Sequence, residues 1–266
     1  MMDQGNDSGV RAQAFALTRD SWNFSALLDA CMDAFRRDWL LLSVGALLTM
    51  LIPYGVSLVG MLAGAIAGQL SQALVLPITV VQALLQFAVQ SALTLGLMAM
   101  ALQALRGAPV ELGQLFGQVR QAPRYLFLTI VAMLAMLVPL GALAGAGYFA
   151  YLQGLFAWNW GTLAFLGLLG LGLFVLFVYA TLPLYFLVPE TVLCAHPGML
   201  QPLRNCYRVV DGQRLPTLAA MFISSGLMLA GVVACCVGVV PALAAMQLLM
   251  GGLYLALRHG ADVERP

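Results

Sequence analysis

Three long stretches of this chain contain no charged residue, and this pattern restricts the chain to a membrane fold. The stretches are residues 39–105, 125–189 and 215–257. A spanning helix needs about 20 apolar residues, so each stretch has room for two spans and a turn. Only 9% of the residues are charged, whereas a soluble domain carries roughly 25%. We therefore expect an all-α membrane protein with six transmembrane helices, arranged as three hairpins and solvated by lipid.

The charged residues fall into four clusters that separate these stretches and predict the topology. The first cluster ends at Asp38, the second and third run over 106–124 and 190–214, and the fourth begins at Arg258. An even number of spans in each stretch places all four clusters on one side, which the positive-inside rule makes the cytoplasm. All basic residues are arginine, as is typical of GC-rich bacterial genomes. We expect a multi-pass protein of the bacterial cytoplasmic (inner) membrane with both termini in the cytoplasm.

Each predicted hairpin follows a short segment with helical amphipathic spacing. Intervals of three and four residues place one apolar set on each helical face, and we expect these helices to lie in the cytoplasmic membrane interface. The three sets are Phe24, Leu27, Leu28, Cys31 and Phe35; Leu112, Leu115, Phe116 and Val119; and Met199, Leu203, Cys206, Tyr207 and Val210.

The first two hairpins share a sequence pattern that indicates an internal repeat. MLIPYG at 50–55 recurs as MLVPLG at 136–141. We predict a single membrane domain over 21–258, built from three repeat units with one orientation, between a disordered tail at 1–20 and a second tail at 259–266. The units are 21–105, 106–190 and 191–258. The spans are expected at 40–66, 74–104, 126–148, 163–187, 216–236 and 239–257.

Two patterns within the predicted spans point to helix contacts. Gln82, Gln86, Gln90 and Thr94 follow one another at four-residue spacing. Either they line a polar path, or they form hydrogen bonds between helices. Small residues let helices approach closely, and the glycines at four-residue spacing are Gly60, Gly64, Gly68, Gly141 and Gly145. They predict packing within the monomer or, alternatively, a seam between copies.

A second candidate region lies at the inner ends of the spans. Glu190 is the charged residue nearest the membrane core, and it either pairs with Arg204 or Arg208 or faces a ligand. With Asp211 and Asp29, these residues form a candidate inner-face site or docking surface. The sequence contains no catalytic constellation and no metal-ligand spacing, so we expect no metal and no cofactor. The net charge of +1 gives no indication of nucleic-acid binding.

Several short motifs resemble a family of bacterial six-span membrane proteins. This family is related to the membrane domain fused to some glycerophosphodiester phosphodiesterases. The resemblance covers residues 22–258, and it implies a six-helix fold and transfers no catalytic residue. The motifs are FRRDW at 35–39, LRG at 105–107, LYFLVPE at 184–190 with the helix around Arg204, and Pro241 with YLAL at 254–257.

These features favour a non-enzymatic membrane component, an accessory or scaffold subunit that acts with membrane lipid, a protein partner or a second copy. The alternative is a passive conduit or transporter for lipid or another small apolar or zwitterionic substrate. An intramembrane enzyme is the least favoured hypothesis, because it would have to use Glu190, His196 or a cysteine at the inner interface.

Overall fold

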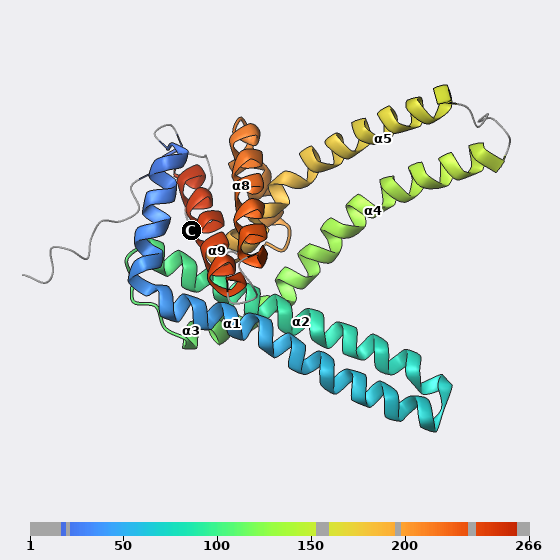
Figure 1. Cartoon of the computed structure of the whole chain (residues 1–266), viewed down its shortest axis with the longest axis horizontal. Helices are drawn as coiled ribbons and strands as arrows, with labels where there is room; N and C mark the ends of the chain where they lie inside the picture. The colour runs from blue at the N-terminus through green and yellow to red at the C-terminus, as the bar shows by residue number, and fades with distance from the viewer. Residues whose placement is uncertain (1–16, 20–21, 153–159, 195–197, 234–237, 260–266) are drawn as a thin grey trace, which may run out of the picture.

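Every regular element in the described part of the chain is helical (Figure 1). The computed structural model describes residues 17–19, 22–152, 160–194, 198–233 and 238–259. The predicted tails at 1–20 and 259–266 therefore lie almost wholly outside the described residues, as does His196. The all-α fold predicted from the sequence is confirmed for the described residues.

The first helix, α1 (Phe24–Leu70), changes direction at Asp38, which has non-helical backbone angles. The Asn23 side chain caps its first turn by accepting a hydrogen bond from the Ala26 amide, 2.7 Å away. The part before Asp38 packs on the last helix, and the part after it runs beside α2 (Gln72–Leu105). Only Ser71 separates the two helices, and its side chain caps the start of α2.

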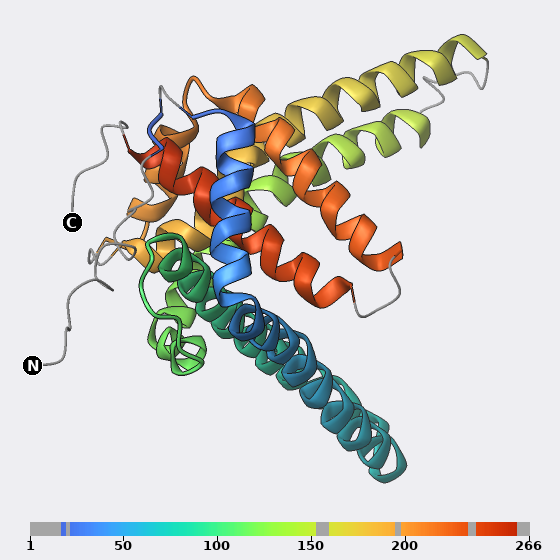
Figure 2. The same ribbon diagram turned by 60° about the vertical axis from the view of Figure 1, so that its left-hand side comes forward.

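A proline interrupts the second helix of the next helical pair near its C-terminal end. α4 (Ala122–Leu152) and α5 (Trp160–Thr181) extend away from the remaining helices in Figures 1 and 2. The sequence suggested one span over 163–187, but the helix ends at Thr181. Pro183 lies in the 3-10 turn η2 (Leu182–Phe186), which α6 (Leu187–Leu193) follows. Proline removes a backbone donor and clashes with the preceding turn, which accounts for the break.

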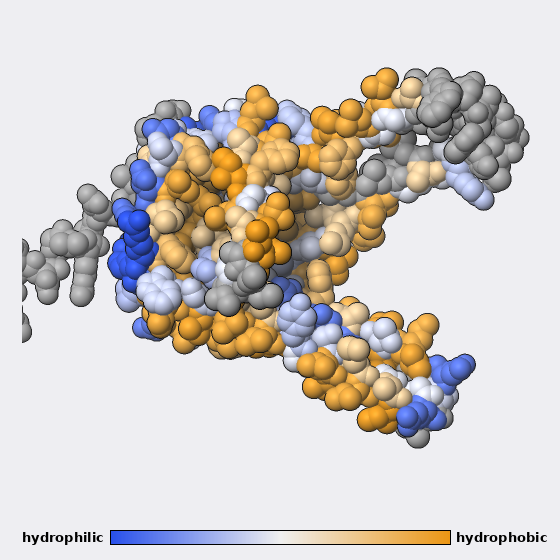
Figure 3. All heavy atoms as spheres, viewed as in Figure 1, coloured by the Kyte–Doolittle hydropathy of each residue, from blue (hydrophilic) through white to orange (hydrophobic). Residues whose placement is uncertain are grey.

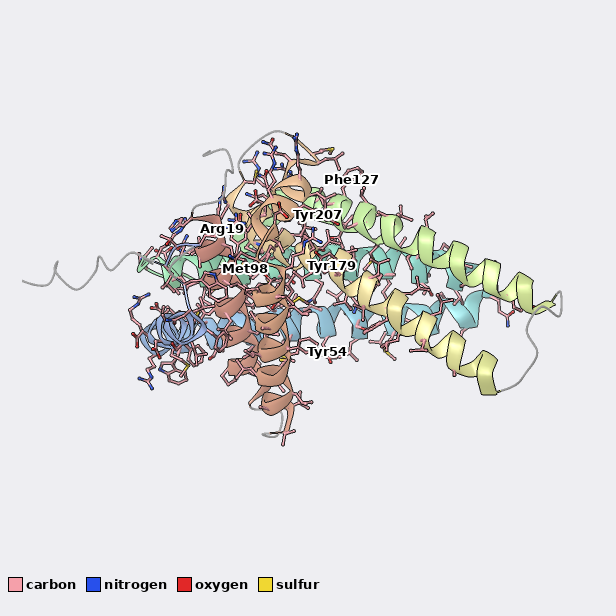
Figure 4. The ribbon with its side chains drawn as sticks, turned by 90° about the horizontal axis from the view of Figure 1, so that it is seen from above. Arg19, Tyr54, Met98, Phe127, Tyr179 and Tyr207 are labelled. Atoms are coloured by element: carbon pink, nitrogen blue, oxygen red, sulfur yellow. The ribbon has the colours of Figure 1, made fainter. Side chains whose placement is uncertain are left out.

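The last helix, α9 (Val239–Arg258), lies at the centre of the molecule (Figure 2). It contacts α1, α2, α7 (Gln201–Val210) and α8 (Arg214–Val233). In the most apolar 18 residues of each helix, 67% are buried in α9 but only 17% in α1. We call the packed region around α9 the base, and Met98 lies within it (Figure 4). It comprises residues 24–46, 92–105, 182–193, 201–210 and 242–257.

Two helical arms project from the base and diverge from each other (Figures 1 and 2). The first arm is residues 47–91 of α1 and α2, and the second is residues 133–152 and 160–181 of α4 and α5. Hydrophobic residues cover much of the first arm and of the described part of the second, whereas hydrophilic residues gather at the opposite end of the molecule and at the tip of the first arm (Figure 3). The apolar surface of the arms fits contact with lipid.

Five helices in the described residues are long and apolar enough to cross a membrane. They lie in α1, in α2, over residues 167–193, and in α8 and α9. This supports a multi-pass membrane protein. The remaining predicted span, 126–148, corresponds to α4, which is not among these five helices.

Contacts between distant residues bring the four charged clusters together. The Arg19 amide donates to the His259 carbonyl, 3.0 Å away, and Arg37 donates to the Ala104 carbonyl. Arg124 donates to the carbonyl of Gly198 at 2.5 Å. All four clusters therefore lie at one end of the molecule.

The buried faces of the three amphipathic segments differ from those that the spacing predicted. Leu27 and Cys31 are buried, but Leu28 is exposed. The second segment is only a five-residue helix, α3 (Gly113–Gly117), followed by the 3-10 turn η1 (Val119–Gln121). Leu115 is its only buried residue among the four predicted, because the helix is too short to form a continuous face.

In the third segment, α7 turns a different face inward. Cys206 and Val210 are buried as predicted, but Tyr207 and Met199 are exposed. Asn205 is buried instead, because its side chain bonds to a carboxylate inside the base. The apolar spacing alone gave no indication of this polar contact.

Candidate functional site

The four polar residues that recur at four-residue spacing on α2 fall into two groups with different surroundings. Gln82 donates from its side-chain nitrogen to the Ser57 carbonyl of α1, 3.3 Å away, and it lines an apolar groove on the first arm. Gln86, Gln90 and Thr94 line a separate cavity of about 380 Å³. Gln82 thus forms the hydrogen bond between helices, and the other three residues lie along a polar space.

The remaining wall of this polar cavity comes from α1 and α9. Thr49, Tyr54 and Ser57 contribute from α1, and Gln247 contributes from α9. No charged side chain appears among the described residues that line it. Figure 4 shows Tyr54 on α1 apart from the end of the molecule that carries Arg19. The cavity is therefore neutral and hydrogen-bonding, and it is open on one side, where Tyr54 and Gln90 are exposed.

Among the residues that line this cavity, Gln247 has a buried polar atom without a hydrogen-bond partner in the described structure. Its side chain is 9% exposed, and its carbonyl oxygen Oε1 is buried without a hydrogen-bond partner among the described residues. The sequence analysis missed this residue because it stands alone, without the four-residue spacing that marked α2. A usable signal was present, since Gln247 is the one amide side chain in the helix VVPALAAMQLLMGGLYLALR.

Glu190 is fully buried in the base, where side chains from two other helices surround its carboxylate. The Asn205 side chain of α7 donates to Oε1 at 2.7 Å, and the Tyr254 hydroxyl of α9 donates to Oε2. Arg258 places Nη1 3.7 Å from Oε2 and 3.0 Å from the Tyr254 hydroxyl. A buried carboxylate with three partners joins α6, α7 and α9, which is a structural role.

The partner of Glu190 is thus Arg258, and the pairing with Arg204 or Arg208 considered from the sequence is wrong. Those two arginines are exposed on α7, and Asp29 is exposed on α1. The exposed Asp211 contributes its backbone carbonyl, which accepts a hydrogen bond from the Arg19 side chain. The five predicted inner-face residues therefore do not converge on one site.

A thiol and an arginine lie beside the Glu190 cluster. The Cys206 thiol is fully buried. Burial raises its pKa well above the usual value, and the nearby Glu190 carboxylate raises that pKa further. Arg124 donates to the Cys194 carbonyl at 3.3 Å, which holds the segment after α6. Among the described residues no group of three or more His, Cys, Asp or Glu side chains is placed to hold a metal ion.

The glycine positions separate into close helix contacts and open surface. A Cβ at Gly60 would lie 2.0 Å from the Gln82 side chain, and one at Gly68 would lie 3.8 Å from Val75. At Gly64, Gly141 and Gly145 an added Cβ meets nothing within 4 Å. At these three glycines no described residue makes the close contact within the monomer that the spacing predicted.

The sequence analysis also missed a much tighter glycine contact. A Cβ at Gly96 of α2 would lie 2.0 Å from the backbone carbonyl oxygen of Leu115 in α3. No four-residue glycine pattern marks this position, so the contact was not apparent from the sequence.

Comparison with known proteins found no matching family model, no matching curated protein and no matching solved structure.

Proposed function

We propose that this chain is a non-enzymatic component of the bacterial cytoplasmic membrane, which acts by binding a second membrane protein or a lipid. In this proposal it spans the membrane six times, as three hairpins in α1–α2, α4–α5 and α8–α9 related by a threefold repeat. Both termini lie in the cytoplasm. The meeting of the four charged clusters at one end supports this topology, because arginine is retained on the cytoplasmic side.

The observation that carries the proposal is the unpartnered apolar surface of the two arms. Phe174 and Leu176 of α5 are each 62% exposed, and Leu58 and Leu62 of α1 are similarly exposed. In the most apolar 18 residues of the span over 167–193, only 28% are buried. Because the arms diverge, lipid or a partner's helices must cover both sides of each arm. This arrangement suits an accessory or scaffold subunit.

Purification in mild detergent, followed by mass spectrometry of the associated proteins and lipids, tests the proposal. A photo-crosslinking phenylalanine analogue at Phe174, on the second arm, should capture a defined protein partner or one lipid class. The same analogue at Phe116, which is 53% exposed on α3, serves as the control position. Equal, unselective labelling from both positions, with the protein purified alone and monomeric, would contradict the proposal.

A second candidate function, a passive conduit for lipid or another small molecule, is favoured by one observation. The polar cavity at Gln86 and Gln90 lies among apolar helices, where polar side chains mark a pathway or a binding site. Reconstituted vesicles carrying a fluorescent lipid provide the assay. Replacing Gln86 and Gln90 with leucine should abolish transfer between leaflets, whereas Gln82→Leu should not. Unchanged transfer in the double variant would rule out this function.

A further inference from the structure

The last turns of α5 and the first turns of α8 form an apolar groove on the second arm. Val175 and Val178 line it from α5, and Leu218 and Phe222 line it from α8. The groove has a volume of about 520 Å³, which greatly exceeds that of one water, roughly 30 Å³. Arg214 is the one charged side chain among the described residues that line it. The groove therefore combines a long apolar wall with a single positive charge.

The groove is about as deep as one leaflet of a bilayer. Its lining residues on α8 run from Arg214 to Ser225, which is roughly 16 Å along the helix axis. Half of the hydrocarbon core measures about 15 Å, and α8 is one of the five helices long and apolar enough to cross a membrane. Arg214 begins α8, at the charged end of the molecule. With this end at the membrane surface, the apolar wall follows the chain region of the adjacent leaflet.

The Arg214 guanidinium lies at the groove without a carboxylate partner. Its carbon Cζ lies 4.2 Å from the ring centroid of Tyr179, which also lines the groove. Stacking on an aromatic ring orients a guanidinium and leaves its N–H groups available as donors. Neither of the two ion pairs among the described residues includes Arg214. An anion can therefore accept hydrogen bonds from Arg214 and neutralise its charge.

The protein around this end of the groove is also positively charged. The Tyr207 hydroxyl of α7 donates to the Ala180 carbonyl of α5, 3.1 Å away, and Figure 4 shows Tyr207 close to Tyr179. Over residues 200–218 the chain carries three arginines and one aspartate, and the aspartate forms no ion pair with a described residue. This positive excess attracts anionic headgroups and offers little to a headgroup that carries an ammonium group.

We propose that Arg214 binds the phosphate of an anionic phospholipid of the cytoplasmic leaflet, one chain of which lies in the groove between α5 and α8. The guanidinium donates to the phosphate oxygens, and Val178 and Leu218 contact the chain from opposite walls. A free phosphate could meet the same arginine, but it would use none of the apolar wall. The inference rests on the proposed function for the orientation in the membrane and for a lipid as binding partner, and it adds the class and place of that lipid.

Photo-labelling of the full-length protein in phosphatidylcholine nanodiscs tests the site. The probe is a phosphatidylglycerol with a photoactivatable chain, and the comparison probe is a phosphatidylcholine with the same chain. We expect the phosphatidylglycerol to label peptides of α5 and α8. Arg214→Gln should reduce this labelling about tenfold, as the loss of one charge-assisted hydrogen bond predicts. Arg120→Gln is the matched control and should keep the labelling, because Arg120 is exposed on η1 and does not line the groove.

A second variant tests the groove separately from the charge. Leu218→Trp fills the groove and keeps Arg214, so it should also reduce labelling by the phosphatidylglycerol. Added phosphatidylglycerol should raise the melting temperature of the wild type and of Arg120→Gln, but not that of Arg214→Gln, because a ligand of the folded state stabilises it. Equal labelling by the two probes would overturn the proposal, as would an equal loss of labelling in Arg120→Gln and Arg214→Gln.

Inorganic phosphate distinguishes a lipid from a soluble anion. If the chain contributes to binding, millimolar phosphate should leave labelling by the phosphatidylglycerol unchanged. Protection by phosphate, together with full labelling in Leu218→Trp, would overturn the lipid and assign Arg214 to a soluble anion. A protein partner captured from Phe174, which also lines the groove, without any preference for phosphatidylglycerol would overturn this site and leave the proposed accessory function intact.

Discussion

Glu190 shows how a single side chain can hold several helices of the base. Its carboxylate is fully buried and bonds to Asn205, Tyr254 and Arg258. The sequence analysis singled out Glu190 as the charged residue nearest the membrane core. It could not identify the partners, because Asn205 is not part of the apolar set predicted for α7 and Arg258 is distant in the chain. The spacing of residues in the sequence indicates which face of a single helix is apolar, whereas this contact depends on how three helices pack together.

Replacing Glu190 should be strongly destabilising. Glu190→Ala leaves the mostly buried Arg258 without its counter-charge and the Asn205 amide without its acceptor. Loss of one partner of a buried ion pair costs about 3–5 kcal/mol, which corresponds to a drop of roughly 6 °C or more in melting temperature for a chain of this size. Glu190→Gln keeps an acceptor and should lose less. Thermal unfolding in detergent measures both, and an unchanged melting temperature in Glu190→Ala would refute the structural role.

Cys206 should resist alkylation in the folded protein even under alkaline conditions. Burial and the Glu190 carboxylate raise its pKa above 9.0, so at pH 8 to 9 the thiol remains protonated, and the thiolate is the reactive form. Cys31 and Cys194 are also free and buried. Mass spectrometry after maleimide treatment should find Cys206 unmodified until denaturant is added. Rapid modification of Cys206 in the native protein would show that α7 does not pack as described.

At the scale of helices, the sequence predicted positions better than orientations. The ends of α2 and α9 lie within two residues of the expected spans, because apolar length and flanking charge set them. The inward face of α7 and the length of α3 differ from the prediction, because neighbouring helices determine both. The predicted glycine contacts show the same limit, since four-residue spacing fitted Gly64 as well as Gly60.

Two glycine substitutions should therefore have opposite outcomes. Gly96→Ala forces α2 away from the Leu115 carbonyl of α3 and should destabilise the protein by about 1–3 kcal/mol, the usual range for overpacking. Gly64→Ala meets no neighbour and improves helix propensity, so it should be neutral or stabilising by about 0.5–1 kcal/mol. Melting temperatures of the two variants check the contrast. Similar losses in both would show that open space at Gly64 is occupied in the native membrane protein.

For the whole molecule, the distribution of charge along the sequence anticipated the arrangement of its ends. Arg19, Arg37, Arg124 and Arg258 contact elements from other charged clusters. The divergence of the arms and the polar cavity were not predictable, because they depend on how the hairpins pack, which the spacing within one helix does not report. The six-span count and the cytoplasmic side remain predictions.

Reporter fusions test this topology directly. Green fluorescent protein fused at either terminus should fluoresce, because both ends are expected in the cytoplasm. Alkaline phosphatase inserted at Ser71 or fused after a truncation at residue 155 should be active, because these turns are expected outside. An active phosphatase fused at the C-terminus would require an odd number of spans and would refute the topology.

The packing of the first helix on the last has a consequence for biosynthesis. The Cys31 thiol donates to the Leu248 carbonyl across 217 positions in the sequence, and α1 rests on α9 over much of the base. A ribosome adds roughly 5–20 residues per second, so the part of α1 before Asp38 waits about 10–45 s in the membrane before α9, on which it packs, is synthesised. During that interval its inner surface is exposed to lipid, to the insertion machinery and to proteases. A nascent chain stopped before Val239 should therefore be far more sensitive to membrane proteases than the finished protein.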